Sequence, residues 1–262
     1  MKINQRATHL AALLGLVTLT ATAHAAQVEV TVTNNAPGGG TWLTPLWVGF
    51  HDGSFDAFDA GSAASAGIEA VAEDGNAMPL GAAFGGVGGI VGGAPIAPGT
   101  SASAQFTIGD GGSAAFLSFA AMVLPSSDFF IGNDDPLAVA LGGLLDGTLG
   151  RVSVDVVRVW DAGTEINDFA TSAANGLFGI PGGQSGPNQG ANENGVISAA
   201  LGSDFLAFLN LGGADVSALD FSGYESLATI TVTQAQPVPL PASLPLIGGA
   251  LAGLGFMRRR LG

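Results

Sequence analysis

Two groups of acidic residues follow apolar segments and have the residue types of a site for a hard cation. Asp128 comes soon after residues 114–124, and Asp161 and Glu165 follow residues 151–160. If these two segments are neighbouring strands, they end in adjacent loops, and Gly163 lets the second loop turn back tightly. Calcium binds roughly six to eight oxygens from carboxylates, carbonyls and water. Asp128, Asp161 and Glu165 are therefore a candidate Ca²⁺ site, and a solvated acidic loop is the alternative.

Few residues in the chain support other kinds of chemistry. His51 is the only histidine after residue 25, and the nucleophile motif G-x-S-x-G does not occur, so a structural role is favoured for His51. Cysteine is absent, which excludes disulfides and zinc sites of histidine and cysteine. The 21 acidic residues leave a glycan hydrolase with paired carboxylates open as an alternative. We expect no catalytic residues and no enzymatic activity.

Basic residues are concentrated at the two ends of the chain. Residues 26–237 contain only Arg151 and Arg158, yet they hold all 21 acidic residues. This segment is therefore more negative than the whole chain, whose net charge is −14. A surface of this kind attracts cations and lacks the basic patch that nucleic acid requires. Nucleic-acid binding is excluded.

The first 25 residues have the features of a secretory signal peptide. Lys2 and Arg6 precede an apolar run, and Ala23 and Ala25 supply the small-x-small pattern of a cleavage site. We therefore expect an exported protein whose mature part begins at residue 26.

The last 25 residues, 238–262, form a second targeting segment. The motif Val238, Pro239, Leu240, Pro241 and Ala242 precedes an apolar stretch and then Arg258, Arg259 and Arg260. We expect a hydrophobic helix that inserts in the inner membrane, with the arginines as a membrane stop on the cytoplasmic side. This tail resembles the PEP-CTERM sorting signals of the VPLPA type in Gram-negative-type bacteria. The resemblance implies an exosortase-type sorting enzyme as a partner, cleavage of the tail near Pro239–Ala242 and an association with biofilm or exopolysaccharide.

Short β-like runs alternate with glycine-rich connections between the two targeting segments. Strands are expected within 28–33, 42–50, 105–108, 114–124, 151–160 (with a bulge after residue 156) and 228–232. Helices are expected from Ser65 to Gly75 and, less strongly, within 137–145, while 81–99 and 182–195 are expected to be loops. The pattern predicts one mainly β domain at 26–237, an antiparallel sandwich with short helices.

Several short motifs along this domain occur in the order of a known family. They are Val30-Thr31-Val32-Thr33-Asn34, His51-Asp52-Gly53, Ala72-Glu73-Asp74-Gly75, Ser127-Asp128-Phe129-Phe130-Ile131-Gly132, Asp161-Ala162-Gly163-Thr164-Glu165 and Gly186-Pro187-Asn188-Gln189-Gly190. Residues 28–234 resemble the spondin N-terminal domain. The resemblance implies a C2-like β-sandwich, adhesive or matrix-binding roles and a Ca²⁺ site at Asp128, Asp161 and Glu165. Glu165 departs from the aspartate of animal members, and their cysteines are missing here.

These features together predict a calcium-binding adhesion or matrix module at the cell surface or outside the cell. The expected partners are polysaccharide or another surface protein, besides the sorting enzyme and the membrane. The alternatives are a secreted glycan hydrolase and a purely structural surface protein without a metal.

Overall fold

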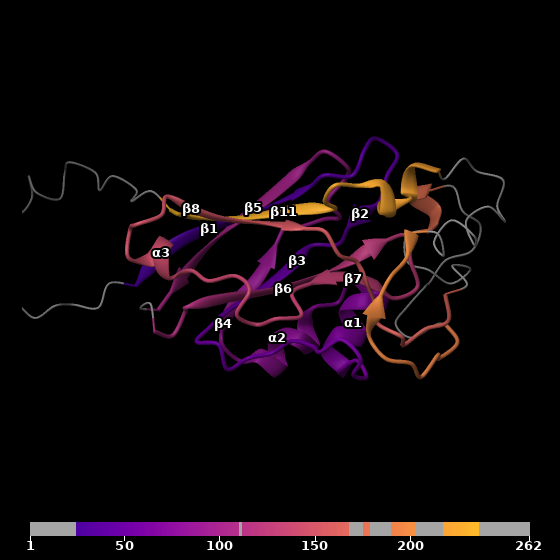
Figure 1. Ribbon diagram of the computed structural model, residues 1–262, viewed down its shortest axis with the longest axis horizontal. Helices are drawn as coiled ribbons and strands as arrows, with labels where there is room; N and C mark the ends of the chain where they lie inside the picture. Colours follow the sequence, from indigo (N-terminus) through magenta and orange to yellow (C-terminus); the bar gives the residue numbers. More distant parts are fainter. Residues whose placement is uncertain (1–24, 110–111, 168–174, 179–189, 203–216, 236–262) are drawn as a thin grey trace, which may run out of the picture.

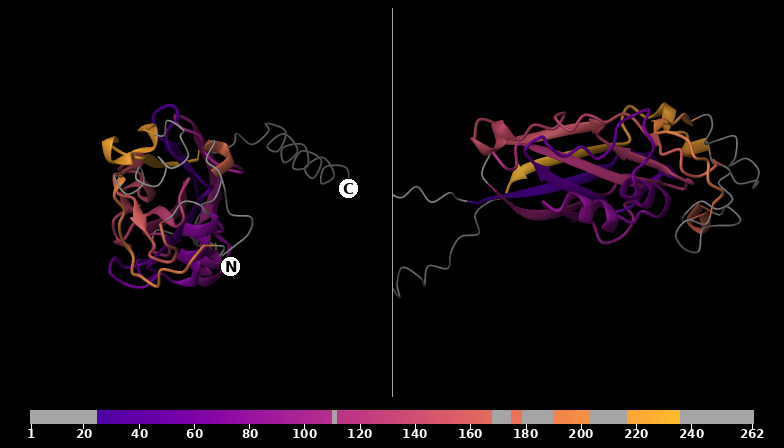
Figure 2. Two further views of the ribbon diagram at one scale, coloured as in Figure 1. Left: turned by 90° about the vertical axis from the view of Figure 1, so that its right-hand side faces the viewer. Right: turned by 90° about the horizontal axis from the view of Figure 1, so that it is seen from below.

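Two antiparallel sheets face one another in the computed structural model, which describes residues 25–109, 112–167, 175–178, 190–202 and 217–235 (Figures 1 and 2). The first sheet has the strand order β5-β1-β11-β8, and the second has the order β10-β9-β7-β6-β3-β4, with β2 paired to β6. In chain order the elements are β1 (Ala26–Asn34), β2 (Trp42–Leu43), β3 (Leu46–His51), α1 (Ala66–Asp74), α2 (Met78–Phe84), β4 (Val87–Val91), β5 (Ser101–Ile108), β6 (Phe116–Leu124), β7 (Phe129–Gly132), α3 (Gly142–Leu145), β8 (Arg151–Val156), β9 (Trp160–Asp161), η1 (Asn175–Phe178), β10 (Ser198–Ala199), η3 (Ser217–Leu219), η4 (Phe221–Gly223) and β11 (Ala228–Gln234). The expected mainly β fold of antiparallel sheets with few short helices is confirmed.

The first sheet has one buried and one polar face, as the period-two pattern of its strands predicts. Val28, Val30 and Val32 of β1 point into the core between the sheets. On the outer face, Thr31 contacts Ser103 of β5 at 2.7 Å, one of several hydroxyl pairs between neighbouring strands. The sheet therefore presents an array of hydroxyl groups to solvent.

The central strands of the second sheet, β3 and β6, are buried on both faces. Leu117 and Phe119 of β6 belong to the core between the sheets, whereas Ala120 faces a second apolar cluster with Trp47 and Ile68. Helices α1 and α2 supply the far side of that cluster, and Figure 1 shows them beneath the second sheet. This double burial explains why β6 reads as a continuous apolar run.

The expected helix that begins after Ser65 is confirmed as α1. The Ser65 side chain accepts a hydrogen bond from the backbone N–H of Ile68, which caps the helix. Gly75 ends the helix in a left-handed conformation with φ of 64°. The weaker helix within 137–145 is reduced to the four residues of α3.

Three sequence expectations are corrected by the structure. Residues 151–160 are not one bulged strand, because β8 lies in the first sheet and β9 lies in the second. Residues 81–99 are not only a loop, since they contain the end of α2 and the whole of β4, whose glycines pack closely against β3. Residues 42–50 are divided between β2 and β3.

The domain begins and ends on neighbouring strands. Val28 of β1 lies opposite Gln234 of β11, and the Ala235 N–H donates to the Gln27 carbonyl at 2.8 Å. The strands occupy residues 26–234, which lie between the expected signal peptide and the expected tail. Residues 1–24 and 236–262, which carry nearly all of both targeting segments, lie outside the described residues. Within the described ranges, no helix has the length and apolar character to cross a membrane.

Candidate metal centre

The pairing of β7 with β9 brings Asp128 next to the loop that contains Asp161 and Glu165. Phe129 lies opposite Asp161, and the Ala162 N–H donates to the Asp128 carbonyl at 3.1 Å. The predicted proximity of the two loops is therefore present. It arises from the short strands β7 and β9 and not from neighbouring segments 114–124 and 151–160, because β8 lies in the other sheet.

The carboxylate of Asp128 clamps the two loops together. Its Oδ2 atom accepts hydrogen bonds from the Thr164 N–H at 2.8 Å, the Thr164 hydroxyl at 3.2 Å and the Glu165 N–H at 3.1 Å. The side chain is completely buried, and no donor among the described residues lies against its Oδ1 atom. Oδ2 therefore accepts three hydrogen bonds, whereas Oδ1 accepts none from the part of the chain that the structure describes.

The loop after β9 turns back at Gly163. This glycine has φ of 66°, and the Gly163 N–H donates to Asp161 Oδ1 at 2.8 Å. Asp161 Oδ2 accepts a hydrogen bond from the Asn167 amide at 2.6 Å. The tight turn that the sequence predicts at Gly163 is therefore confirmed, and it sets the direction of Asp161.

The carboxylate of Glu165 lies toward a different segment from that of Asp161. Glu165 is completely buried, and its Oε1 accepts a hydrogen bond from the Gly190 N–H at 2.7 Å. A further carboxylate, Glu73 at the end of α1, is 2% exposed and lies close enough to Glu165 and Thr164 for these to affect its ionisation. Sequence reasoning did not include Glu73 in the site, because nothing in the chain indicates that α1 packs against this loop.

Burial and mutual repulsion make these carboxylates costly to ionise. Burial, followed by the charge of Asp161, raises the pKa of Asp128 to about 7. Burial raises the pKa of Glu73 to about 7 as well, and the charge of Glu165 adds to this effect. Neither Arg151 nor Arg158, the only arginines or lysines between residues 26 and 237, is among the groups that shift these two pKa values.

Comparison with protein families assigns the fold. A model of the Spondin_N family matches residues 30–175, which is more than half of the chain. The chain belongs to the spondin N-terminal family. Domains of this family are modules of the extracellular-matrix and adhesion type. A search of curated proteins finds no match to the chain. The spondin domain here extends past the matched segment, since β11 pairs with β1 along its whole length.

The donor atoms of this spondin domain fit a hard cation. Three side-chain oxygens buried in the two loops have no hydrogen-bond partner among the residues that the structure describes: Ser127 Oγ, Asp128 Oδ1 and Asn167 Oδ1. Buried oxygens of this kind need water or an ion as partner. Within the described ranges, no three acidic, histidine or cysteine side chains already form a metal-binding group. Asp128 and Asp161 are electrostatic neighbours, and Glu165 joins them through its backbone while its carboxylate lies near Glu73.

His51 of the spondin domain is a structural residue, as the sequence predicts. Its Nδ1 accepts a hydrogen bond from the Gly53 N–H at 3.0 Å, which leaves Nε2 to donate to the buried Ser118 hydroxyl at 3.0 Å. The carboxylate of Asp52 accepts from the Ser54 N–H and does not orient the imidazole as a triad requires. Burial lowers the pKa of His51, so the neutral ring is favoured.

Proposed function

We propose that this spondin domain is an exported, non-enzymatic adhesion or matrix module that Ca²⁺ stabilises at the end formed by the β6–β7 and β9 loops. The observation that carries the proposal is a set of buried oxygens on these loops that have no hydrogen-bond partner among the described residues, Ser127 Oγ, Asp128 Oδ1 and Asn167 Oδ1, beside the clustered carboxylates. Carboxylate and amide oxygens are the ligands that Ca²⁺ prefers, and the ion supplies the missing positive charge.

Asp128 and Asp161 are the side chains that would hold the ion, and the buried Glu165 carboxylate, which lies toward Gly190 and Glu73, adds negative charge at the same loop. Asp128 offers Oδ1, because Oδ2 is already used by the Thr164 and Glu165 loop. Asn167 offers its side-chain oxygen, because its nitrogen donates to Asp161. Bound calcium would neutralise repulsion among the carboxylates and fix the two loops relative to one another, so binding and stability are coupled.

Isothermal titration of the domain with CaCl₂ tests this proposal. The wild-type domain is expected to bind Ca²⁺, and Asp161→Asn is expected to abolish most of that binding. Asp52→Asn is the matched control, because Asp52 is an exposed aspartate just after His51, which pairs with Phe116 at the opposite end of β6. Equal titrations for wild type and Asp161→Asn would refute the assignment.

Thermal unfolding separates the proposal from a structural protein without a metal. We expect the unfolding temperature to rise in CaCl₂ relative to EDTA, and to rise little with MgCl₂ at equal concentration, because Mg²⁺ releases its water reluctantly. Coincident curves in CaCl₂ and EDTA would favour the purely structural alternative.

We also propose that the domain reaches the cell surface through removal of residues 1–25 and sorting of residues 238–262 by an exosortase-type enzyme. The fold supports these boundaries, since β1 starts at Ala26 and β11 ends at Gln234. Mass spectrometry of the mature protein is expected to give an N-terminus at Ala26 and a C-terminus near residues 239–242. Retention of either segment in the mature protein would contradict this part of the proposal.

A further inference from the structure

A hollow of about 440 Å³ lies at the same end of the sandwich as the candidate metal centre. Its lining is formed by the residues just after β1 and just before β11: Asn35, Pro37, Gly223, Tyr224, Glu225 and Ser226. The two places are linked through the core, since the Phe129 ring next to Asp128 packs against Phe221 with centroids 6.2 Å apart. The hollow is separate from the metal centre and shares no residue with it.

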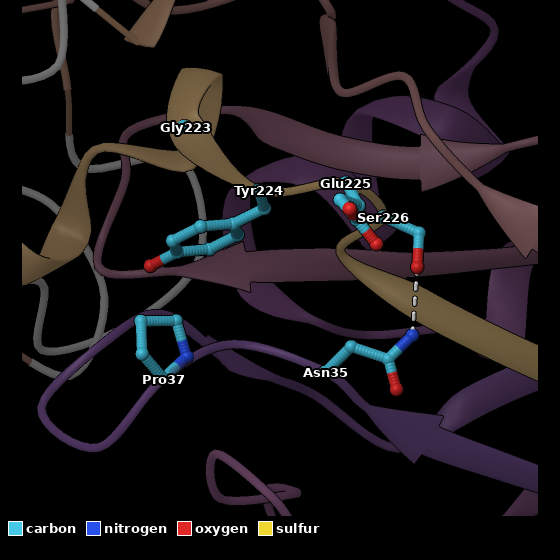
Figure 3. Close-up of a pocket in the computed structure, with 6 residues that line it drawn as sticks. All are labelled: Asn35, Pro37, Gly223, Tyr224, Glu225 and Ser226. Atoms are coloured by element: carbon cyan, nitrogen blue, oxygen red, sulfur yellow. Dashed lines mark hydrogen bonds between the residues drawn. The ribbon is translucent and has the colours of Figure 1, made fainter.

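One side of the hollow is formed by two rings. Figure 3 shows the Tyr224 ring above the Pro37 ring, with Asn35 and Ser226 on the other side of the hollow. Glu225 lies between Tyr224 and Ser226. The Tyr224 hydroxyl donates to the Ala218 carbonyl and is thereby held away from the hollow. The ring is consequently fixed before any ligand arrives, which lowers the entropic cost of binding.

The polar side of the hollow is also fixed in advance. The Asn35 amide nitrogen donates to Ser226 Oγ at 2.8 Å and to Thr229 Oγ1 at 2.9 Å. Because Ser226 Oγ accepts from Asn35, its own proton is available to a ligand. Glu225 is exposed and adds a carboxylate that accepts hydrogen bonds from hydroxyl groups.

The chemistry of the lining selects the ligand class. The lining holds no basic side chain, and the domain is strongly acidic, so phosphate and other anions are excluded. A cationic peptide is less suited, because the lining offers only one carboxylate, Glu225, and only one aromatic ring, Tyr224, to attract a cation. A neutral sugar ring has apolar C–H faces for Tyr224 and Pro37 and hydroxyls for Glu225 and Ser226.

The outer face of the first sheet continues this chemistry beyond the hollow. Asn35 points to the same face as Thr33, and its hydrogen bond to Thr229 joins the hollow to the hydroxyl array. That array includes the pairs Thr33–Ser101, Thr31–Ser103 and Ser153–Thr231, at 2.8, 2.7 and 3.0 Å. Helices α1 and α2 lie on the other sheet and leave this face open (Figure 1).

We propose that the hollow between Tyr224, Pro37 and Glu225 is a binding subsite for one ring of a neutral polysaccharide, whose further rings follow the hydroxyl face of the first sheet. The proposal rests on the adhesive function proposed above for its biological role, and it names the partner class as glycan. It does not depend on the calcium site, because the two sites have different residues.

Tyr224 is the only tyrosine of the chain and provides a direct probe. A domain grown with 3-fluorotyrosine gives one ¹⁹F resonance, which can be followed during titration with cellohexaose, laminarihexaose and chitohexaose. A saturable shift with at least one of the three supports the proposal. No shift with any of them overturns it, as does a larger response to a tetralysine peptide than to each saccharide.

Variants locate the binding in the hollow. Glu225→Ala removes an exposed carboxylate and leaves the core untouched, and it is expected to weaken the saccharide affinity about tenfold. Tyr224→Leu, checked for folding by circular dichroism and followed by calorimetry, is expected to weaken it at least as much. Asp52→Asn at the opposite end should leave affinity unchanged. Equal affinity of Glu225→Ala and wild type would overturn the assignment.

The same variants distinguish failure of this inference from failure of the proposed calcium function. Glu225→Ala is expected to bind Ca²⁺ as wild type does, and Asp161→Asn is expected to retain saccharide binding in EDTA. Saccharide binding without calcium binding would refute only the metal proposal. Calcium binding without saccharide binding would refute only the subsite.

Discussion

Two substitutions of Asp128 separate its structural clamp from its proposed role as a calcium ligand. Alanine removes the acceptor for the backbone N–H groups of Thr164 and Glu165 and for the Thr164 hydroxyl. Each backbone donor left without a partner costs about 1–3 kcal/mol, so Asp128→Ala should lower the free energy of unfolding by about 2–6 kcal/mol. Asparagine keeps an oxygen in the position of Oδ2, so Asp128→Asn should lower the free energy of unfolding by only about 1 kcal/mol.

Calcium should stabilise wild type more than it stabilises Asp128→Asn, although the two proteins differ little in EDTA. At a free Ca²⁺ concentration of about 100 times the dissociation constant, a protein that binds only when folded gains about 2.7 kcal/mol. Wild type is expected to show this gain, whereas Asp128→Asn, which has one carboxylate fewer, should gain less than half of it. Urea unfolding followed by tryptophan fluorescence in EDTA and in CaCl₂ measures both effects, since Trp47 and Trp160 are buried.

The proposed ligand role of Asp128 and its structural role can be refuted separately. If Asp128→Asn gains as much from calcium as wild type does, Asp128 is not a ligand. If Asp128→Ala loses less than about 1 kcal/mol in EDTA, the three hydrogen bonds do not hold the loops together.

Four further substitutions test other contacts of the structure. Gly190→Ala places a Cβ against the Glu165 carboxylate and should weaken calcium binding in calorimetry, and an unchanged affinity would place Glu165 outside the site. Gly75→Ala should cost more unfolding free energy in urea than Gly85→Ala: both glycines have φ of 64°, but a Cβ at residue 75 would lie 2.5 Å from the Thr44 methyl, whereas a Cβ at residue 85 would come no nearer than 4.0 Å to the Ala82 carbonyl oxygen. Burial lowers the pKa of His51 below 6.5, so the unfolded chain takes up this proton first and stability falls as the pH drops below about 6.5. His51→Gln should therefore lessen the loss of stability between pH 7 and pH 5, and an identical pH profile in urea titrations would contradict the assignment.

The strands with one polar face could be predicted from the sequence because their alternation is local. Val28, Val30 and Val32 indicate β1 without further information, and Ser65 and Gly75 mark both ends of α1 through capping chemistry. The exchange of sheets between β8 and β9 could not be predicted, since the shift of phase at Val157 is equally compatible with a bulge. Strand β4 was missed because two glycines in its interior disguise its pattern.

The candidate site shows the same division between local and tertiary information. Asp128, Asp161 and the turn at Gly163 follow from residue type and position along the chain. Glu73 joins the site only because α1 packs on the second sheet, and a contact between elements so far apart in the chain has no sequence signal. The hollow at Tyr224 is hidden for the same reason, because Asn35 after β1 and Ser226 before β11 are 191 residues apart along the chain.

The neighbouring positions of Gln27 and Ala235 determine how the domain would be displayed on a cell. If the domain is attached to the cell through its C-terminal side, the attachment point lies at the end of the sandwich where β1 begins and β11 ends. Strand β11 has seven residues, which at about 3.3 Å per residue raise the opposite tip roughly 23 Å above the point of attachment. The loops of the candidate metal centre and the Tyr224 hollow would then face outward, and removal of either terminal segment would leave both of these sites unchanged.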